Sequence, residues 1–291
     1  MKKLSIFTLV LLIVFCSGCG RNLNFDIVAT TLPVYDFTTF LCQGTDLSVG
    51  RLVTESVSCL HDYSLQAVQM RMIEGADAVV ISGAGLESFL DDALHSQHLI
   101  DASKHVHIHS EVHSHGHDEP THGHAHDVDP HFWLSTENAK TMSVNICNEL
   151  SSLYPEQEKI FRKNLTSLTE KLDALQEYGN TKLSDLSTRE LITFHDGFSY
   201  FAEGFDLEIL DSVEEESGSE ASAAQIIHLV DLIETHSLPA IFVETNGSDS
   251  CAGIIRDETD VAIYTLDMAM AGNSYFDSMY HNIDTIKEAL G

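Results

Sequence analysis

Basic residues are scarce in this chain of 291 residues, which has 15 lysines and arginines against 45 aspartates and glutamates. With neutral histidines the formal net charge is −30. Such a charge argues against nucleic acid and against an anionic membrane surface as partners, because both would repel the protein. Cations are the partners that this composition favours.

The sequence motifs of common hydrolases and nucleotide-binding enzymes are also missing. The chain contains no HExxH pattern, no GxSxG elbow and no P-loop. With 43% hydrophobic residues it nevertheless has enough apolar side chains for packed cores, and its length suggests about two domains. We therefore expect a globular protein, and a zinc hydrolase is the less favoured reading.

The N-terminus has an apolar stretch that is too short to cross a bilayer, since residues 4–15 fall below the roughly 20 residues that a spanning helix needs. Two lysines precede this stretch, and residues 1–18 are expected to be a signal peptide. The following Ser-Gly-Cys looks like a lipobox, which predicts cleavage before Cys19 and lipidation of its thiol. The mature protein is then exported and anchored to the outer face of the bacterial cell membrane, or periplasmic. A signal peptide without lipidation is the alternative.

Cysteines are few beyond this site, and their spacing matches no zinc pattern built on pairs of cysteines. Disulfides can persist outside the cytoplasm. Cys42 and Cys59 lie close enough in sequence for a local disulfide, whereas Cys147 and Cys251 would have to meet across a domain boundary. The sequence leaves the pairing open.

Short apolar, β-branched runs alternate with amphipathic stretches in both halves of the chain. Strands are expected at 25–31, 47–53, 77–81 and 98–101, and again at 191–195, 207–210, 240–244 and 261–266, with first-half helices near 33–42, 65–75 and 87–96. Such alternation is typical of parallel sheets covered by helices. The expected fold class is α/β, with two lobes that each hold a parallel-rich sheet flanked by helices.

A longer helical pattern lies between the two halves, over residues 155–178, where apolar residues recur at helical spacing. Pro155 suits its first turn, and Gly179 with Asn180 suits its end. We interpret it as a rigid connecting helix, although a helix packed within one lobe would show the same pattern. The expected domains are a signal peptide (1–18), an N-terminal metal-binding lobe (19–153), the connecting helix (154–180) and a C-terminal metal-binding lobe (181–291).

Histidine is concentrated in one segment, because nine of the 17 histidines fall within 22 positions. Residues 105–128 have no pattern of a helix or strand, and their repeated His and Gly cannot bury enough apolar area to become ordered. Imidazole is a good ligand for zinc, copper and nickel. The segment is expected to be an accessory, weak, multi-site metal-collecting loop, or else a solvated tract. Its histidines are His105, His107, His109, His113, His115, His117, His122, His124 and His126.

Four further residues are metal-ligand candidates, namely His61, His131, His195 and Asp267. Most follow predicted strands, where open parallel sheets bind ligands, and two come from each lobe. Three imidazoles and one carboxylate suit a tetrahedral divalent ion. Because four protein ligands leave no open position for water or substrate, binding is favoured over catalysis. Free imidazole has a pKa of about 6.5 and binds metal only when neutral, so acidification should favour release.

Several segments together resemble the zinc- and manganese-binding solute-binding proteins of ABC importers, the ZnuA type in particular. They are "VATTLPVYDFT", "CLHDYSL", "ADAVVISGAGLESFLDD", "DPHFWLS", "TFHDGFSYFAEGF", "AIFVE" and "YTLDMAM". The resemblance implies two α/β lobes joined by a long helix, with the metal between them. It matches the family's ligands to His61, His131, His195 and Asp267. The third position tends to be His in zinc members and Glu in manganese members, so Zn²⁺ is the expected ion.

The same resemblance implies a function and two supporting residues. Glu244 matches a family acidic position and is expected beside the ligands, and Asp196 either orients an imidazole or caps a helix. The implied function is capture of Zn²⁺ and its delivery to an ABC permease with its ATPase, by a monomer anchored to the membrane through Cys19. A manganese-specific protein and a surface adhesin are the alternatives. The chain departs from the family pattern in "DYSLQ" after His61 and in Met268 where proline is usual.

Overall fold

The computed structural model describes most of the chain beyond its N-terminus. The described residues are 24–54, 60, 63–90, 93–94, 97–109, 128–213, 222–245, 250–270 and 272–291. The signal peptide and the lipidation site at Cys19 lie outside these ranges and stay predictions. Within the described part of the chain, no helix is both long and apolar enough to cross a membrane.

The N-terminal lobe is built on a four-stranded parallel sheet in the order β2-β1-β3-β4. Its strands are β1 (Ile27–Ala29), β2 (Val49–Arg51), β3 (Ala78–Ile81) and β4 (His98–Asp101). The central strands are continuous apolar runs, as expected of strands covered on both faces. Alternate side chains of β1 and β3 pack into two different clusters, one with helix α1 (Leu32–Leu41) and the other with α2 (Ala67–Gly75).

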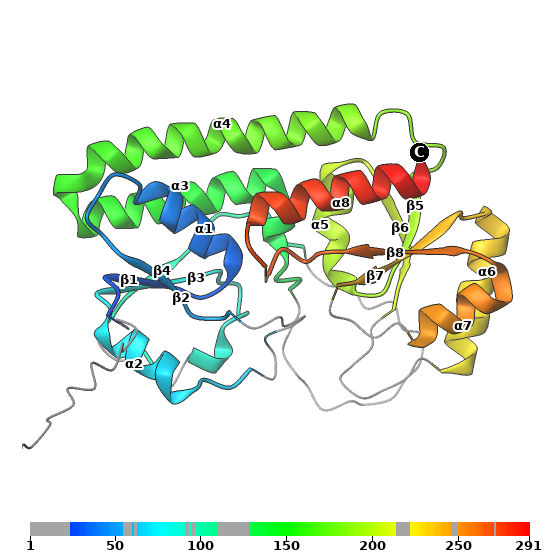
Figure 1. The fold of residues 1–291 in the computed structure, drawn as a ribbon, viewed down its shortest axis with the longest axis horizontal. Helices are drawn as coiled ribbons and strands as arrows, with labels where there is room; N and C mark the ends of the chain where they lie inside the picture. Colours follow the sequence, from blue (N-terminus) through cyan, green and yellow to red (C-terminus); the bar gives the residue numbers. More distant parts are fainter. Residues whose placement is uncertain are drawn as a thin grey trace, which may run out of the picture.

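The C-terminal lobe repeats this arrangement with a four-stranded parallel sheet in the order β6-β5-β7-β8. Its elements are β5 (Glu190–Thr193), α5 (Ser199–Gly204), β6 (Glu208–Ser212), α6 (Ala223–His236), β7 (Ala240–Glu244), α7 (Ser250–Thr259), β8 (Ala262–Leu266) and α8 (Tyr275–Leu290). In both sheets the first strand lies between the second and the third (Figure 1). The predicted fold of two α/β lobes with parallel sheets is confirmed.

The long helix α4 (Glu158–Lys182) runs across both lobes, at the top of Figure 1. Its 25 residues make a rod of about 37 Å. It packs against α1 and α3 (Thr136–Leu153) on the N-terminal side and against α8 on the C-terminal side. One stripe of apolar side chains is buried along it, so the helix is anchored to both lobes rather than free between them.

Several expected boundaries differ from the structure. A short 3₁₀ turn (Pro155–Gln157) precedes α4, and the helix continues three residues past the expected stop at Gly179. Of the helix expected over 87–96, the described residues contain only the 3₁₀ turn Ser88–Leu90. Helix α3 has no separate counterpart among the elements expected from the sequence.

Gly179 does not end the helix, and its role is a close approach between elements. A Cβ atom at this position would lie 2.1 Å from Cε1 of Phe205, whose ring is buried and packs against Phe201. The absence of a side chain therefore lets the residues after α5 pack directly against α4. The expectation that Gly179 ends the helix was wrong, because glycine is needed at this position for tertiary packing.

Replacing Gly179 with alanine should destabilise the protein. The clash with Phe205 should cost about 1–3 kcal/mol through overpacking, and the higher helix propensity of alanine offsets at most about 1 kcal/mol of that. Urea denaturation followed by circular dichroism measures the difference. Gly204→Ala is the matched control, because its Cβ would meet nothing within 4 Å; an equal effect in both variants would contradict this packing role.

Two of the described cysteines lie in the core without a disulfide partner among the described residues. Cys42 and Cys147 are buried free cysteines in the structure. Cys59 lies outside the described residues, so the local pairing proposed for it stays a prediction. Burial raises the pKa of the Cys42 thiol to about 12, which makes this thiol unreactive at neutral pH.

Candidate metal centre

The first imidazole of the site, that of His131, is buried at the boundary between the lobes. It precedes a 3₁₀ turn (Phe132–Leu134) and is 3% exposed. Two residues further on, Nε1 of Trp133 donates to the carbonyl oxygen of Met268 at 2.8 Å. The Tyr275 hydroxyl in turn donates to the Trp133 carbonyl at 2.8 Å. The "DPHFWL" segment is thereby fixed to the loop after β8 and to the start of α8.

The second imidazole comes from the other lobe. His195 follows β5 by two residues, and the Thr193 hydroxyl donates to the His195 carbonyl at 2.9 Å. The rings of His131 and His195 are 4.9 Å apart and nearly perpendicular. Their nitrogens and a carboxylate oxygen of Asp196 all lie within 4.8 Å of one another, one of two such groups among the described residues. The structure thus brings together ligand atoms that are far apart in sequence.

The close approach of the two lobes depends on Gly197. A Cβ atom there would lie 2.7 Å from Cγ and Nδ1 of His131 and 2.4 Å from Cε of Met268. Glycine is therefore required in the turn after His195 for this turn to rest on the His131 ring.

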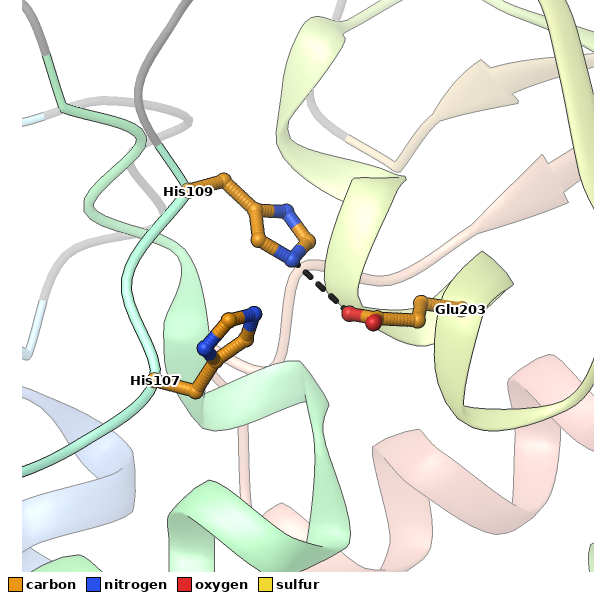
Figure 2. Close-up of side chains that lie close together, drawn as sticks. All are labelled: His107, His109 and Glu203. Carbon is orange, nitrogen blue, oxygen red and sulfur yellow. Dashed lines mark hydrogen bonds and ion pairs between the residues drawn. The ribbon is translucent and has the colours of Figure 1, made fainter.

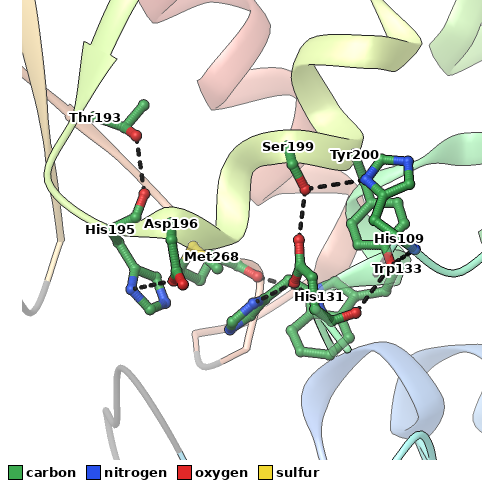
Figure 3. A network of polar contacts seen from close by, with 10 residues as sticks. His109, His131, Trp133, Thr193, His195, Asp196, Ser199, Tyr200 and Met268 are labelled. Carbon is green, nitrogen blue, oxygen red and sulfur yellow. Dashed lines mark hydrogen bonds and ion pairs between the residues drawn. The ribbon is translucent and has the colours of Figure 1, made fainter. Parts of the chain in front are cut away.

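Asp129 sets the orientation of His131, whose side chain is drawn in Figure 3 near those of His195 and Ser199. Its Oδ1 accepts from the His131 backbone N–H at 2.9 Å and lies 2.8 Å from Nδ1, while its Oδ2 accepts from the Ser199 hydroxyl. Burial raises the pKa of the Asp129 carboxyl, but the hydrogen bonds from His131 and Ser199 outweigh burial, and the net pKa is lowered. The group is an ionised carboxylate at neutral pH.

This carboxylate determines which nitrogen of His131 can bind a metal. Because an ionised carboxylate only accepts hydrogen bonds, the neutral His131 ring that a metal requires has its proton on Nδ1 and its lone pair on Nε2. That Nε2 is buried and has no hydrogen-bond partner within the described part of the chain. A buried acceptor without a partner is costly, and a metal ion would satisfy it. The pattern of carboxylate, histidine and vacant nitrogen is the usual support of a metal-binding imidazole.

Replacing Asp129 with asparagine should weaken zinc binding by about 10- to 100-fold without unfolding the protein, because the variant keeps the shape but loses the charge that orients His131. Competition with a chelating indicator measures the affinity. Asp211→Asn is the matched control, since Asp211 pairs with the exposed His228 at 3.3 Å. An unchanged affinity in Asp129→Asn would contradict the orienting role.

The remaining predicted site residues differ in how close they lie to the His131 and His195 rings. Asp267 accepts hydrogen bonds from the Ala269 backbone N–H at 2.8 Å and from the Ser278 hydroxyl at 2.9 Å, and it is not in the group of His131 and His195. Glu244 is buried at the end of β7. Asp196 lies 3.4 Å from Nδ1 of His195. His61 is outside the described residues, so the ligand set as a whole stays a prediction.

Of the histidines in the accessory segment, the structure describes three, His105, His107 and His109. The other six lie outside the described residues, as does the rest of the expected loop over 110–127. Sequence reasoning also missed Asp129, although its place two residues before a candidate ligand was a usable signal.

Comparison with known proteins finds relatives over nearly the whole chain. The family model described as the periplasmic zinc-uptake complex component A matches residues 27–289. A protein of Treponema pallidum that is named for metal binding is 28% identical over 277 residues, covering 90% of this chain and 86% of its own. The zinc-binding lipoprotein AdcA of Streptococcus pneumoniae is 27% identical over 312 residues, covering 99% of this chain, which spans 61% of the relative's length. The crystal structure of ZnuA has the same fold, with a TM-score of 0.78 at 24% identity over 92% of this chain and all of the other.

Proposed function

Because the chain belongs to the family of periplasmic zinc-uptake complex components A, we propose that it captures Zn²⁺ outside the cytoplasm and delivers it to an ABC permease with its ATPase. The observation that carries this proposal is the buried Nε2 of His131, which has no hydrogen-bond partner among the described residues and belongs to a ring 4.9 Å from that of His195 on the opposite lobe. Zinc is here the transported substrate and not a resident cofactor. We therefore propose a binding protein rather than an enzyme.

The proposed ligands are His61, His131, His195 and Asp267. A carboxylate has about four lone-pair directions, so Asp267 can keep its bonds to Ala269 and Ser278 and still offer an oxygen to the ion. The carboxylate of Asp196 lies nearer to the two rings in the structure, and we assign it to orienting His195. Glu244 is proposed as a further acidic neighbour.

The rest of the proposal concerns the organisation of the mature protein. Lobes over 19–153 and 181–291 hold the metal between them, and the helix over 154–180 limits their relative motion. The mature chain is proposed to be a monomer anchored through a lipid on Cys19 to the outer face of the cell membrane.

The test is a competition between Zn²⁺ and Mn²⁺ for the metal-free mature protein. Trp133 is the single tryptophan of the chain, and its ring lies 5.4 Å from that of His131, so intrinsic fluorescence should report binding. We expect zinc to be preferred over manganese by about tenfold or more, because imidazole nitrogen favours zinc. Equal or tighter binding of manganese would contradict the proposal in favour of a manganese-specific protein.

A further inference from the structure

A second group of metal-ligand atoms lies outside the His131–His195 pair. It consists of His107 and His109, at the start of the histidine-rich segment, and of Glu203 on α5 in the other lobe (Figure 2). Their ligand atoms all lie within 4.8 Å of one another. Nε2 of His109 is 2.8 Å from Oε2 of Glu203, and the two imidazole rings are 5.2 Å apart.

The backbone of His107 is held in place by one buried side chain. Asn138 on α3, which is 4% exposed, accepts from the His107 N–H at 2.9 Å and donates to the His107 carbonyl at 2.9 Å. Such a pair of bonds fixes both polar groups of one residue. His107 is therefore part of the folded N-terminal lobe.

His109 is held equally firmly, by the opposite lobe. Its N–H donates to the Tyr200 hydroxyl at 2.8 Å, and its ring stacks on the Tyr200 ring at 4.1 Å and 9°. Its carbonyl accepts from the Asp129 N–H at 3.3 Å. The two imidazoles are thus presented by an ordered stem whose position is set before any metal binds.

The chemistry of the three groups fits a divalent cation. Two imidazole nitrogens and one carboxylate oxygen are common zinc ligands, with metal–ligand distances of about 2.0–2.2 Å. Donors around such an ion are about 3.4 Å apart, so a shift of about 1 Å in exposed side chains would close the group. The side chains of His107 and Glu203 are both exposed, so little packing opposes such a shift. A simple ion pair would involve only His109 and Glu203. His107, whose backbone is held by Asn138, adds a third donor, as a metal site requires.

We propose that His107, His109 and Glu203 form a discrete second divalent-cation site, distinct from the His131–His195 site, which joins the base of the histidine-rich segment to helix α5. The fourth position is left to water, so this site is weaker and exchanges faster than a site with four protein ligands. It does not depend on the proposed transport function, because none of its donors belongs to the primary ligand set.

The experiment removes the other six histidines and keeps this site. Residues 110–127 are replaced by a short glycine linker, which is feasible because the Asp129 N–H already bonds to the His109 carbonyl. Zinc stoichiometry is measured by equilibrium dialysis and affinity by indicator competition. We expect the shortened chain to bind two zinc ions, and His107→Ala or Glu203→Gln to remove the weaker one while the tighter changes by no more than about twofold.

Two further variants separate the outcomes. His228→Ala removes another exposed imidazole beside a carboxylate and should leave both zinc ions bound. His195→Ala should remove only the tighter one, and if it does not, the proposed transport site fails while the second site stands. The second site is overturned if the shortened, folded chain binds a single zinc ion, or if Glu203→Gln leaves the zinc content unchanged in both the shortened and the full-length chain.

Discussion

Replacing either His131 or His195 with alanine should weaken zinc binding at the primary site by about 100-fold or more. Zinc sites with four protein ligands bind with an apparent free energy of roughly 10–16 kcal/mol, so each ligand accounts for about 3 kcal/mol, or two orders of magnitude. The loss should be similar for the two variants, because each ring supplies one nitrogen from one lobe. His131→Ala also leaves the ionised Asp129 without its imidazole partner.

The measurement is a zinc titration followed by the fluorescence of Trp133, repeated with an indicator of known affinity. His228→Ala is the control for removing a histidine that lies away from the site. A variant that lacks residues 105–126 should keep the primary affinity nearly intact, since its histidines are not in the primary ligand set. Equal losses in His195→Ala and in this deletion would contradict the separation of the two kinds of site.

The parts of the fold that were predictable from sequence are those set by local pattern. The strands of both sheets lie within a few residues of the expected ranges, because runs such as "IVA" and "AVVI" must be buried on both faces. The place of His195 after β5 followed from the same reasoning. Its approach to His131 was expected because two candidate ligands come from each lobe, and the family resemblance implied the same; the two rings lie 4.9 Å apart.

The features that sequence reasoning missed are those set by contacts between distant segments. Gly179 was expected to end a helix, yet glycine is needed there because the ring of Phe205 packs against this position. Glu203 faces His109 across 94 positions of sequence, with no local signal to link them. Asp129 is the exception, since a carboxylate two residues from a candidate ligand can bond to its ring nitrogen.

The six-residue "DPHFWL" segment combines local contacts with contacts to distant parts of the chain. Asp129 orients the ring of His131, and the Trp133 side chain bonds to the loop that follows β8. The same loop carries Asp267, and Met268 lies against Gly197 in the turn that bears His195. Trp133 therefore links the orientation of one proposed ligand to the position of the loop that holds another.

Replacing Trp133 with alanine should lower the free energy of unfolding by about 3–5 kcal/mol, the usual cost of removing a fully buried large aromatic side chain. Trp133 is 0% exposed, and its Nε1–H satisfies the Met268 carbonyl. Urea denaturation of the metal-free protein, followed by far-ultraviolet circular dichroism, measures the change. A loss below about 1 kcal/mol would contradict a central role in the core.

Trp133→Phe separates the packing of the ring from its hydrogen bond. Phenylalanine keeps most of the buried apolar surface but leaves the Met268 carbonyl without its donor, which should cost about 1–3 kcal/mol. If the bond to Met268 positions the loop for metal binding, zinc affinity should fall in Trp133→Phe under conditions where the variant is fully folded. Normal zinc affinity in that variant would show that Trp133 supports the core alone, and that the loop carrying Asp267 is held by its own bonds to Ser278 and Asn282.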